Sequence, residues 1–421
     1  MHQLLPQFAH SGHGLYTLLN SLPASVDGTT GPSHGGPVEY IALPLLVLQL
    51  ALAHRYFTRH HPDGAHPGRI AILMGLAAMW AVSAASLVLT WSGVFYKSSP
   101  IPAGYRAAFV AIGYFWIALS SASLVIVVAL RSLLLRIPNL HSPTRRRLLG
   151  AAGVVAFCVP AAATAFGVFV VRKDYGVTEL DLPIAGLHPD FEGFRIAQVS
   201  DLHVSPFLSV RDAARVIDMT NELRADLALF TGDLITERGD PLDEAIRELI
   251  RLRAGYGVFG CMGNHEEYVG CRNYLQQQAG RAGLTFLRGA ATQIRRGQGV
   301  LNIAGVDYQR TGNRGTYLHH TERLVIPDVP NILLSHNPDV FPVAIRRGFQ
   351  AVIGGHTHGG QVNVEILHQN ITPVRFKTPY ISGLYREENA SCFVTNGIGT
   401  IGMPIRLGAP PEVALLRLVR A

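Results

Sequence analysis

Residues 352–361 read VIGGHTHGGQ, a short apolar run followed by two histidines that stand one residue apart among four glycines. The apolar run is typical of a buried strand, and the glycines permit a tight turn directly after it. His356 and His358 therefore leave the end of one strand together. The close spacing of the two imidazoles on a turn indicates that they are metal ligands, each facing a different ion.

Four other apolar runs end in residues of the same kinds. FRIAQVS (194–200) precedes Asp201 and His203, ADLALFT (225–231) precedes Asp233, YGVFGCM (256–262) precedes Asn264, His265 and Glu266, and NILLS (331–335) precedes His336. Intervening segments such as VRDAARVIDMTNEL and PLDEAIRELIRLR have the apolar spacing of helices. Ligands of layered α/β folds gather beyond the carboxyl ends of strands, so we expect these side chains to converge on one site.

The donor set indicates more than one metal ion. Three carboxylate or amide oxygens and four imidazoles are available, from Asp201, His203, Asp233, Asn264, His336, His356 and His358. That number exceeds the needs of one tetrahedral zinc, and the set contains no thiolate. A mixed nitrogen and oxygen set suits Mn, Fe or Zn. Two divalent ions bridged by a carboxylate fit the count, with Asp233 as the natural bridge. Taken alone, His336 is more often a capping or core histidine than a ligand, and Asp201 alone fits an N-cap or turn residue as well.

The order Asp-x-His, Gly-Asp, Gly-Asn-His-Glu, His and Gly-His-x-His resembles the calcineurin-like metallophosphoesterases, in particular their membrane-associated or twin-arginine-exported bacterial subgroup. The resemblance covers residues 175–421 and extends to the segments GVDY and NGIGTIGMPIRLGAPPEV. It implies a four-layer α/β sandwich with two central sheets and a dimetal centre. It also implies that Asp201, His203, Asp233 and His358 hold one ion, and that Asp233, Asn264, His336 and His356 hold the other.

The resemblance implies a metal-dependent phosphoric ester hydrolase with a metal-bridging hydroxide as its nucleophile. His265 would donate a proton to the leaving oxygen or bind the phosphoryl group, and Glu266 would orient His265. The substrate would be a phosphodiester, a phosphomonoester or a pyrophosphate, with an envelope lipid headgroup as one candidate. The alternative is a non-catalytic membrane sensor or scaffold that binds metal or ligand. The complete donor set and the presence of His265 speak against that alternative.

The first part of the chain has the composition of a membrane region. Only 15% of all residues are charged, against about 25% in ordinary soluble domains. Uncharged runs of more than twenty residues occur at Ile70–Tyr96, Ala107–Leu130 and Leu148–Val171, and a weaker one lies within Val38–Phe57. About twenty apolar residues span a bilayer. We therefore expect a flexible tail (1–37), an all-α transmembrane region of about four helices (38–172) and a metallophosphoesterase domain (173–421).

Arginines near these runs predict the orientation. Loops 54–69 and 131–147 hold three and five arginines, which places both loops in the cytoplasm by the positive-inside rule. The protein is then a multi-pass protein of the inner (plasma) membrane, with its catalytic domain outside the cytoplasm. Thr144–Leu149 resembles a twin-arginine export motif, and ordinary positive-inside anchoring explains the same arginines. Both interpretations send the domain to the same side, and release by cleavage near residue 165 stays open.

The remaining composition excludes some classes of partner and site. The pI of about 9.4 reflects these arginines, and the soluble half has no basic stripe interleaved with aromatic residues, so we expect no nucleic-acid partner. The four cysteines form no CxxC pair, which argues against a zinc ribbon or a redox motif. One disulfide, between Cys261 and Cys271, remains open from the sequence.

Overall fold

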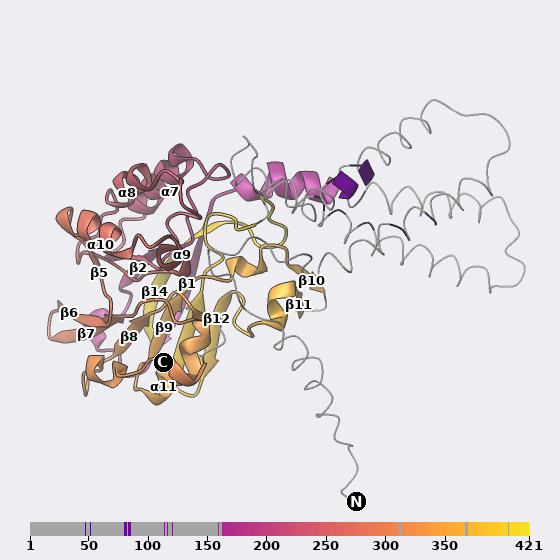
Figure 1. Ribbon diagram of the computed structural model, residues 1–421. Helices are drawn as coiled ribbons and strands as arrows, with labels where there is room; N and C mark the ends of the chain where they lie inside the picture. Colours follow the sequence, from indigo (N-terminus) through magenta and orange to yellow (C-terminus); the bar gives the residue numbers. More distant parts are fainter. Residues whose placement is uncertain are drawn as a thin grey trace, which may run out of the picture.

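Two six-stranded sheets form the centre of the domain that follows residue 173 in a computed structural model (Figure 1). The structure describes residues 162–310, 314–366, 369–402 and 404–421. It also describes isolated earlier positions, namely Val47, Ala51, Trp80, Ala81, Ser83, Ala84, Ala85, Gly113, Trp116, Ser120 and Val159.

The first sheet combines a parallel core with an edge formed by the two ends of the domain. Its order is β1-β14-β2-β3-β4-β5. The bounds are β1 Gly176–Ile184, β14 Glu412–Arg420, β2 Arg195–Val199, β3 Leu227–Phe230, β4 Val258–Gly260 and β5 Leu284–Phe286. Strands β2 to β5 run parallel, β14 runs antiparallel to β2, and β1 runs parallel to β14. The C-terminal strand β14 is thus an inner strand that ties the last residues of the chain to its middle.

The second sheet also has a parallel core, with an antiparallel strand at each edge. Its order is β12-β13-β9-β8-β7-β6. The bounds are β12 Gly383–Glu387, β13 Ala390–Val394, β9 Ala351–Gly354, β8 Asn331–Leu334, β7 Gly299–Gly305 and β6 Ala290–Arg296. Strands β13, β9, β8 and β7 are parallel neighbours, while β12 and β6 are antiparallel to β13 and β7. A separate two-stranded hairpin comprises β10 Val364–Ile366 and β11 Gln369–Ile371.

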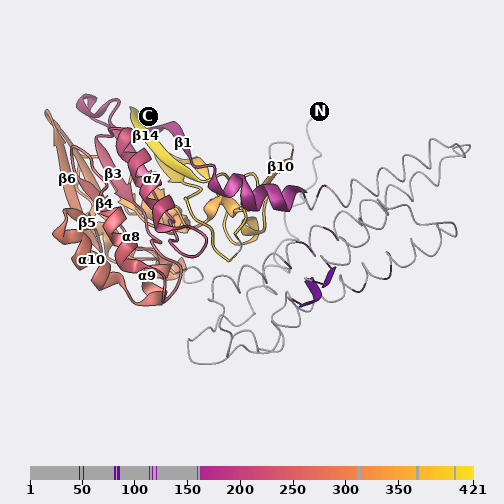
Figure 2. The same ribbon diagram turned by 90° about the horizontal axis from the view of Figure 1, so that it is seen from above.

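Helices cover the outer faces of the sheets (Figures 1 and 2). The α-helices are α7 Val210–Glu222, α8 Leu242–Leu249, α9 Asn264–Val269, α10 Arg272–Arg281 and α11 Phe341–Arg346. The 3-10 turns are η1 Val171–Lys173, η2 Pro189–Phe191, η3 Arg314–Thr316, η4 Thr321–Leu324, η5 Pro338–Val340, η6 His358–Gly360 and η7 Pro373–Phe376. Residues 162–169, ahead of η1, are also helical. Helix α7 begins at a capping box in which Ser209 and Asp212 satisfy each other's backbone N–H groups.

Three apolar clusters show how these layers pack. One lies between the sheets and includes Ile196 and Leu229 of the first sheet with Ile303 and Ile332 of the second. A second cluster joins the first sheet to α7, α8 and α10, and a third joins the second sheet to α11. Strands β3, β8 and β9 are buried along their whole length, because parallel strands covered on both faces need apolar residues on both. The prediction of a mixed α/β domain with two sheets is confirmed.

The expected membrane region and the open disulfide have different outcomes. The tail 1–37 and the predicted spans lie outside the described residues, apart from the isolated positions and the last part of the run 148–171. Among the described residues, no helix combines the length and the apolar character needed to cross a bilayer. Cys261 and Cys271 are buried free thiols, so the disulfide that the sequence left open is not formed.

Candidate metal centre

The candidate ligands follow strands of both sheets. Asp201 and His203 leave β2, Asp233 leaves β3, and Asn264 opens helix α9 directly after β4. His336 leaves β8 of the second sheet, and His356 and His358 leave β9. All five strands lie in the parallel part of their sheet. Their carboxyl ends therefore point to one edge of the sandwich, and the loops converge there.

Donor atoms in these loops form overlapping groups. Within each group, the donor atoms lie within 4.8 Å of one another. The groups are Asp201, His203 and His358, then Asp233, His336 and His356, and finally His203, Asp233 and His265. Asp233 links the first two groups, because its Oδ2 atom is 3.4 Å from His203 Nε2 and 3.0 Å from His336 Nε2. Asn264 joins the second group, with its Oδ1 atom 3.1 Å from His336 Nε2.

Backbone and side-chain acceptors fix the histidine rings. His336 donates from Nδ1 to the carbonyl oxygen of Thr231 over 2.7 Å, which leaves Nε2 to face the donor cluster. His203 Nδ1 lies 3.2 Å from the Thr236 hydroxyl, so its Nε2 atom also faces the cluster. In His356 the nitrogen that faces the cluster is Nδ1, 3.2 Å from His336 Nε2. Hydrogen bonds of this kind set the tautomer and orientation of metal-binding histidines.

Burial and charge suit this cluster to cations. The Nε2 atom of His203 is buried and has no hydrogen-bond partner, although buried nitrogens are normally paired. Burial, together with the charge of His336, lowers the pKa of His356 to about 3. Burial acts the same way on His336, but the carboxylates of Asp233 and Asp201 outweigh it and raise the pKa to about 10. The two carboxylates therefore stabilise a positive charge at His336. A metal ion held by neutral imidazoles would supply that positive charge in place of the proton.

The loops hold several of these residues in strained backbone conformations. Asp201, His203 and Asp233 have φ values of 53°, 47° and 59°, and His356 and His358 have values of 74° and 53°. Left-handed backbone is uncommon outside glycine, and it gathers at functional sites where the surroundings enforce it. The sequence gives no sign of this strain.

Glycine is required where these loops touch each other. A Cβ atom on Gly263 would lie 2.7 Å from the backbone nitrogen of Asp233 and in hard contact with its carboxylate. Atoms at that distance overlap, so Gly263 lets the loop after β4 approach the bridging carboxylate.

His265 stands beside the cluster and is oriented by backbone. Its Nδ1 atom lies 2.5 Å from the carbonyl oxygen of Thr236, and its backbone N–H donates to Asp233 Oδ1 over 2.9 Å. Its ring centre is 4.7 Å from that of His203. With Nδ1 donating to a carbonyl, Nε2 is free to exchange a proton with a bound ligand. Burial lowers the pKa of His265, so the free imidazole is mainly neutral at pH 7.

Glu266 occupies a different position from the one that the sequence suggested. Its buried carboxylate accepts backbone N–H groups from Asp233 at 2.9 Å, Leu234 at 2.6 Å and Gly263 at 2.7 Å. The expectation that Glu266 orients His265 therefore needs correction, because Thr236 bonds the His265 ring and Glu266 bonds two metal-site loops. The glutamate fixes the loop that carries Asp233 to the loop that carries Asn264.

Sequence reasoning also missed Arg406, which no pattern marked as buried. Its side chain is fully buried, and its guanidinium donates to the carbonyl oxygens of Asn396 at 2.9 Å, Ala409 at 2.9 Å and Gly397 at 3.1 Å. A guanidinium has five N–H donors and suits a cage of carbonyl oxygens. Arg406 thus organises the loop before β14. The resemblance of residues 396–413 to the family was the one signal that drew attention to this segment.

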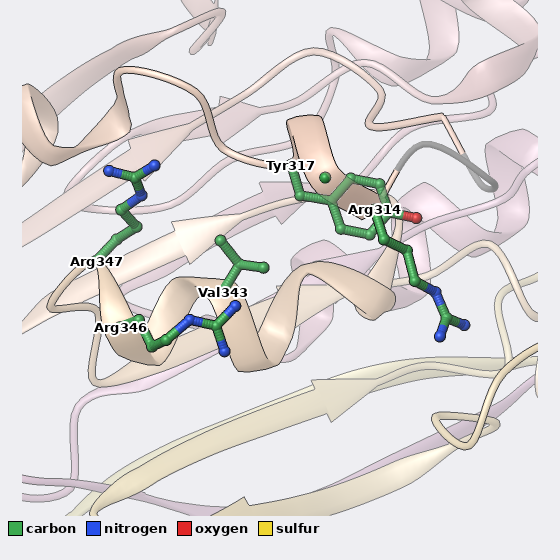
Figure 3. A pocket seen from close by; sticks show the side chains of 6 residues that line it. Arg314, Tyr317, Val343, Arg346 and Arg347 are labelled. Atoms are coloured by element: carbon green, nitrogen blue, oxygen red, sulfur yellow. The ribbon is translucent and has the colours of Figure 1, made fainter.

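Figure 3 shows a hollow whose lining residues differ from the metal-donor residues. It has a volume of about 380 Å³ and is lined by Arg314, Gly315, Tyr317, Val343, Arg346 and Arg347. Arg314 and Arg347 point to opposite sides of the hollow in Figure 3. None of its lining residues belongs to the metal-donor groups.

Comparison with known proteins agrees with the geometry of the cluster. The profile of the calcineurin-like phosphoesterase family matches residues 194–360. An uncharacterized metallophosphoesterase, YkuE of Bacillus subtilis, is 31% identical over 235 residues, which cover 54% of this chain and 80% of the relative. Phosphodiesterase YaeI of Escherichia coli is 29% identical over 229 residues, covering 54% of this chain and 82% of the relative.

A vertebrate relative is matched over a longer stretch. The transmembrane protein with metallophosphoesterase domain of Danio rerio is 25% identical over 280 residues, covering 64% of this chain and 63% of the relative. The two sheets, the clustered aspartates and histidines, and these similarities lead to one assignment. The chain belongs to the calcineurin-like metallophosphoesterases, which are enzymes that use two divalent metal ions.

Proposed function

We propose that this protein is a membrane-anchored dimetal phosphoesterase whose catalytic domain lies outside the cytoplasm. The domain would comprise residues 173–421, after a flexible tail (1–37) and a helical membrane region (38–172). The uncharged runs of the sequence support the anchor. The vertebrate relatives that carry the name transmembrane protein with metallophosphoesterase domain support it as well. An enzyme anchored in this way meets phosphoesters of envelope lipid headgroups at its own membrane.

The observation that carries the proposal is the meeting of seven donor residues from both sheets at one edge. Asp201, His203, Asp233 and His358 would hold one ion, and Asp233, Asn264, His336 and His356 would hold the other. The Nε2 atom of His203 has no hydrogen-bond partner and lies 3.4 Å from Asp233 Oδ2, and the same carboxylate oxygen lies 3.0 Å from His336 Nε2; both contacts fit these roles. Two divalent ions, when bound, supply electrophilic charge at the phosphoryl oxygens and lower the pKa of water.

The residues of the chain would divide the remaining work. Asp233 stays ionised, because His336 and His203 outweigh its burial and hold its pKa well below the usual value. His265 would hold a proton at Nε2 for the leaving oxygen, or donate it to a phosphoryl oxygen, while Thr236 keeps Nδ1 occupied. A bound phosphoryl anion would favour the protonated imidazole and so offset the effect of burial. Such proton transfer contributes about 10²–10⁴-fold to a rate.

Among phosphoesters, we favour diesters over monoesters and pyrophosphates. The support is the similarity to a relative named phosphodiesterase.

The test uses the full chain in detergent with Mn²⁺ or Zn²⁺. Hydrolysis of bis(4-nitrophenyl) phosphate should exceed that of 4-nitrophenyl phosphate, and Asp233→Asn should abolish both metal binding and turnover. Asp181→Asn is the matched control, since Asp181 pairs with Arg417 on the surface. Turnover that survives in Asp233→Asn would refute the dimetal assignment.

The second candidate function is a metal- or ligand-binding membrane sensor without catalysis. It would be supported if the protein bound two ions tightly and hydrolysed neither ester. Orientation is tested separately by reporter fusions placed after Val171. An active alkaline phosphatase at that position agrees with an exported domain, whereas an active cytoplasmic reporter contradicts it.

A further inference from the structure

Two tyrosines form an arc beside the metal cluster, Tyr268 of α9 and Tyr308, the last residue of the GVDY segment. The ring of Tyr308 lies 5.5 Å from that of His356 and 6.0 Å from that of His336. The ring of Tyr268 lies 5.6 Å from that of His265 and 6.5 Å from that of Tyr308. The arc therefore runs from the ligands of the proposed second ion to the proposed proton donor.

The two rings differ in exposure. Tyr308 is 6% exposed, whereas Tyr268 is 62% exposed although it stands on α9 next to the cluster. Burial still raises the pKa of Tyr268, while a hydrogen bond with Tyr308 acts in the opposite direction. Tyr308 is thus part of the buried surroundings of the cluster, whereas the ring of Tyr268 is accessible to a ligand from solvent. An exposed aromatic ring beside a site offers a surface on which a flat ligand group can stack.

Neighbouring charges keep the segment of Tyr268 in place. Glu267, which is 12% exposed at its side chain, bonds Arg310 and also Arg272, the latter at 3.2 Å. These pairs join α9 to the loop after β7 and to the start of α10. The segment of α9 that carries Tyr268 is therefore held at the rim by the ion pairs of Glu267, which lowers the entropic cost of a contact with a ligand.

The position of the Tyr268 ring beside His265 relates the ring to the leaving group of a bound substrate. A residue that protonates the leaving oxygen lies within hydrogen-bond reach of that oxygen. The group attached to the leaving oxygen then extends past His265, and Tyr268 is the exposed ring in contact with His265. A flat group at this place can stack on the phenol ring, whereas a small alkyl group leaves the ring face in water.

We propose that Tyr268 is a specificity-determining residue that contacts the leaving group, so that the site favours phosphoesters whose leaving alcohol carries a flat ring. The inference rests on the proposed function, because it needs a phosphoryl group at the metal cluster and His265 beside the leaving oxygen. It narrows the substrate class from phosphoesters in general to those with an aromatic or similarly flat leaving group.

The test compares phenylphosphonate with methylphosphonate, which bind through the same phosphoryl oxygens and are not hydrolysed. Dissociation constants are measured by calorimetry on the Mn²⁺-loaded full chain. The wild type should bind the phenyl compound about 3- to 10-fold more tightly, in line with a stacked aromatic pair. Tyr268→Ala should lose this preference and keep its affinity for methylphosphonate. Tyr268→Phe should retain the preference, because the ring and not the hydroxyl makes the contact.

A kinetic measurement on the same variants separates contact from scaffolding. With bis(4-nitrophenyl) phosphate, Tyr268→Ala should raise KM by the same factor and leave kcat nearly unchanged. Tyr274→Ala is the control, since Tyr274 is a 43% exposed tyrosine of α10 that donates to Asp243 outside the donor groups.

Three outcomes would overturn the inference. They are a phenyl preference that survives in Tyr268→Ala, an equal loss of affinity for both phosphonates, and equal binding of both by the wild type. Failure of the wild type to bind either phosphonate would instead remove the proposed phosphoryl site itself.

Discussion

Replacement of Glu266 by glutamine separates two explanations for this buried carboxylate. The carboxylate accepts three backbone N–H groups, two at Oε2 from Asp233 and Gly263 and one at Oε1 from Leu234. Glutamine keeps the shape of the side chain but has one acceptor oxygen and one NH₂ group. In its better orientation the glutamine oxygen takes the place of Oε2, and the NH₂ group then faces the N–H of Leu234.

The magnitude follows from the bonds that are lost. One hydrogen bond to a charged acceptor contributes about 1.5–3 kcal/mol, and a domain of this size loses about 2–4 °C in Tm for each kcal/mol. We expect Glu266→Gln to lower Tm by about 3–12 °C. The loop that carries Asp233 is held less firmly, so the metal affinity should fall by about 10–100-fold.

The assay titrates Mn²⁺ against a chelating dye and follows thermal unfolding of the same preparations. Glu267→Gln is the matched control, because the neighbouring glutamate pairs with Arg272 and Arg310 near the surface. That variant should lower the free energy of unfolding by less than about 1 kcal/mol, since the partner Arg310 is 72% exposed and ion pairs with exposed arginines contribute little. Unchanged metal affinity in Glu266→Gln, together with a loss in kcat, would refute the reasoning and restore the role of Glu266 in orienting His265.

Three further predictions follow from the same contacts. His265→Gln should retain two bound ions by elemental analysis and lower kcat by about 10²–10⁴-fold; loss of the ions would contradict its place outside the ligand set. Gly263→Ala should impair metal binding, because its Cβ would overlap Asp233, whereas Gly280→Ala meets nothing within 4 Å and should stabilise helix α10 by about 1 kcal/mol in denaturant melts. Removal of the ions by a chelator should cost about 2.7 kcal/mol for each ion whose free concentration was 100 times its Kd, and calorimetry that shows the same Tm with and without chelator would exclude a loaded site.

The sequence predicted the strands that carry the site but not all of the strands that support them. The runs before Asp201, Asp233 and His336 form β2, β3 and β8. These strands were predictable because buried parallel strands need continuous apolar residues, which are visible in the sequence. Strand β14 was missed as a partner of β2, since pairing between positions more than 200 residues apart leaves no local trace. Helix α8 ends at Leu249, whereas the helical pattern of the sequence continued through Arg251 to Arg253.

For the site, residue types in sequence order were informative, whereas their partners were not. The order of aspartates and histidines indicated a metal cluster, because few chemistries need so many nitrogen and oxygen donors. The roles of Thr236 and Glu266 depend on backbone groups, which every residue carries and no pattern displays. Tyr268 and Tyr308 could not be placed for a similar reason, since their neighbours come from other loops.

The donor groups take residues from both sheets, and this has a consequence for how the domain unfolds. Asp233 belongs to the first sheet and His336 to the second, and one ion would require both. A ligand shared by two halves binds only while both are folded, so it couples their opening. Metal-loaded protein should therefore lose both sheets in a single cooperative transition. Without ions, the apolar layer between the sheets is the main remaining link, and hydrogen exchange at the site edge should become faster than in the strand centres.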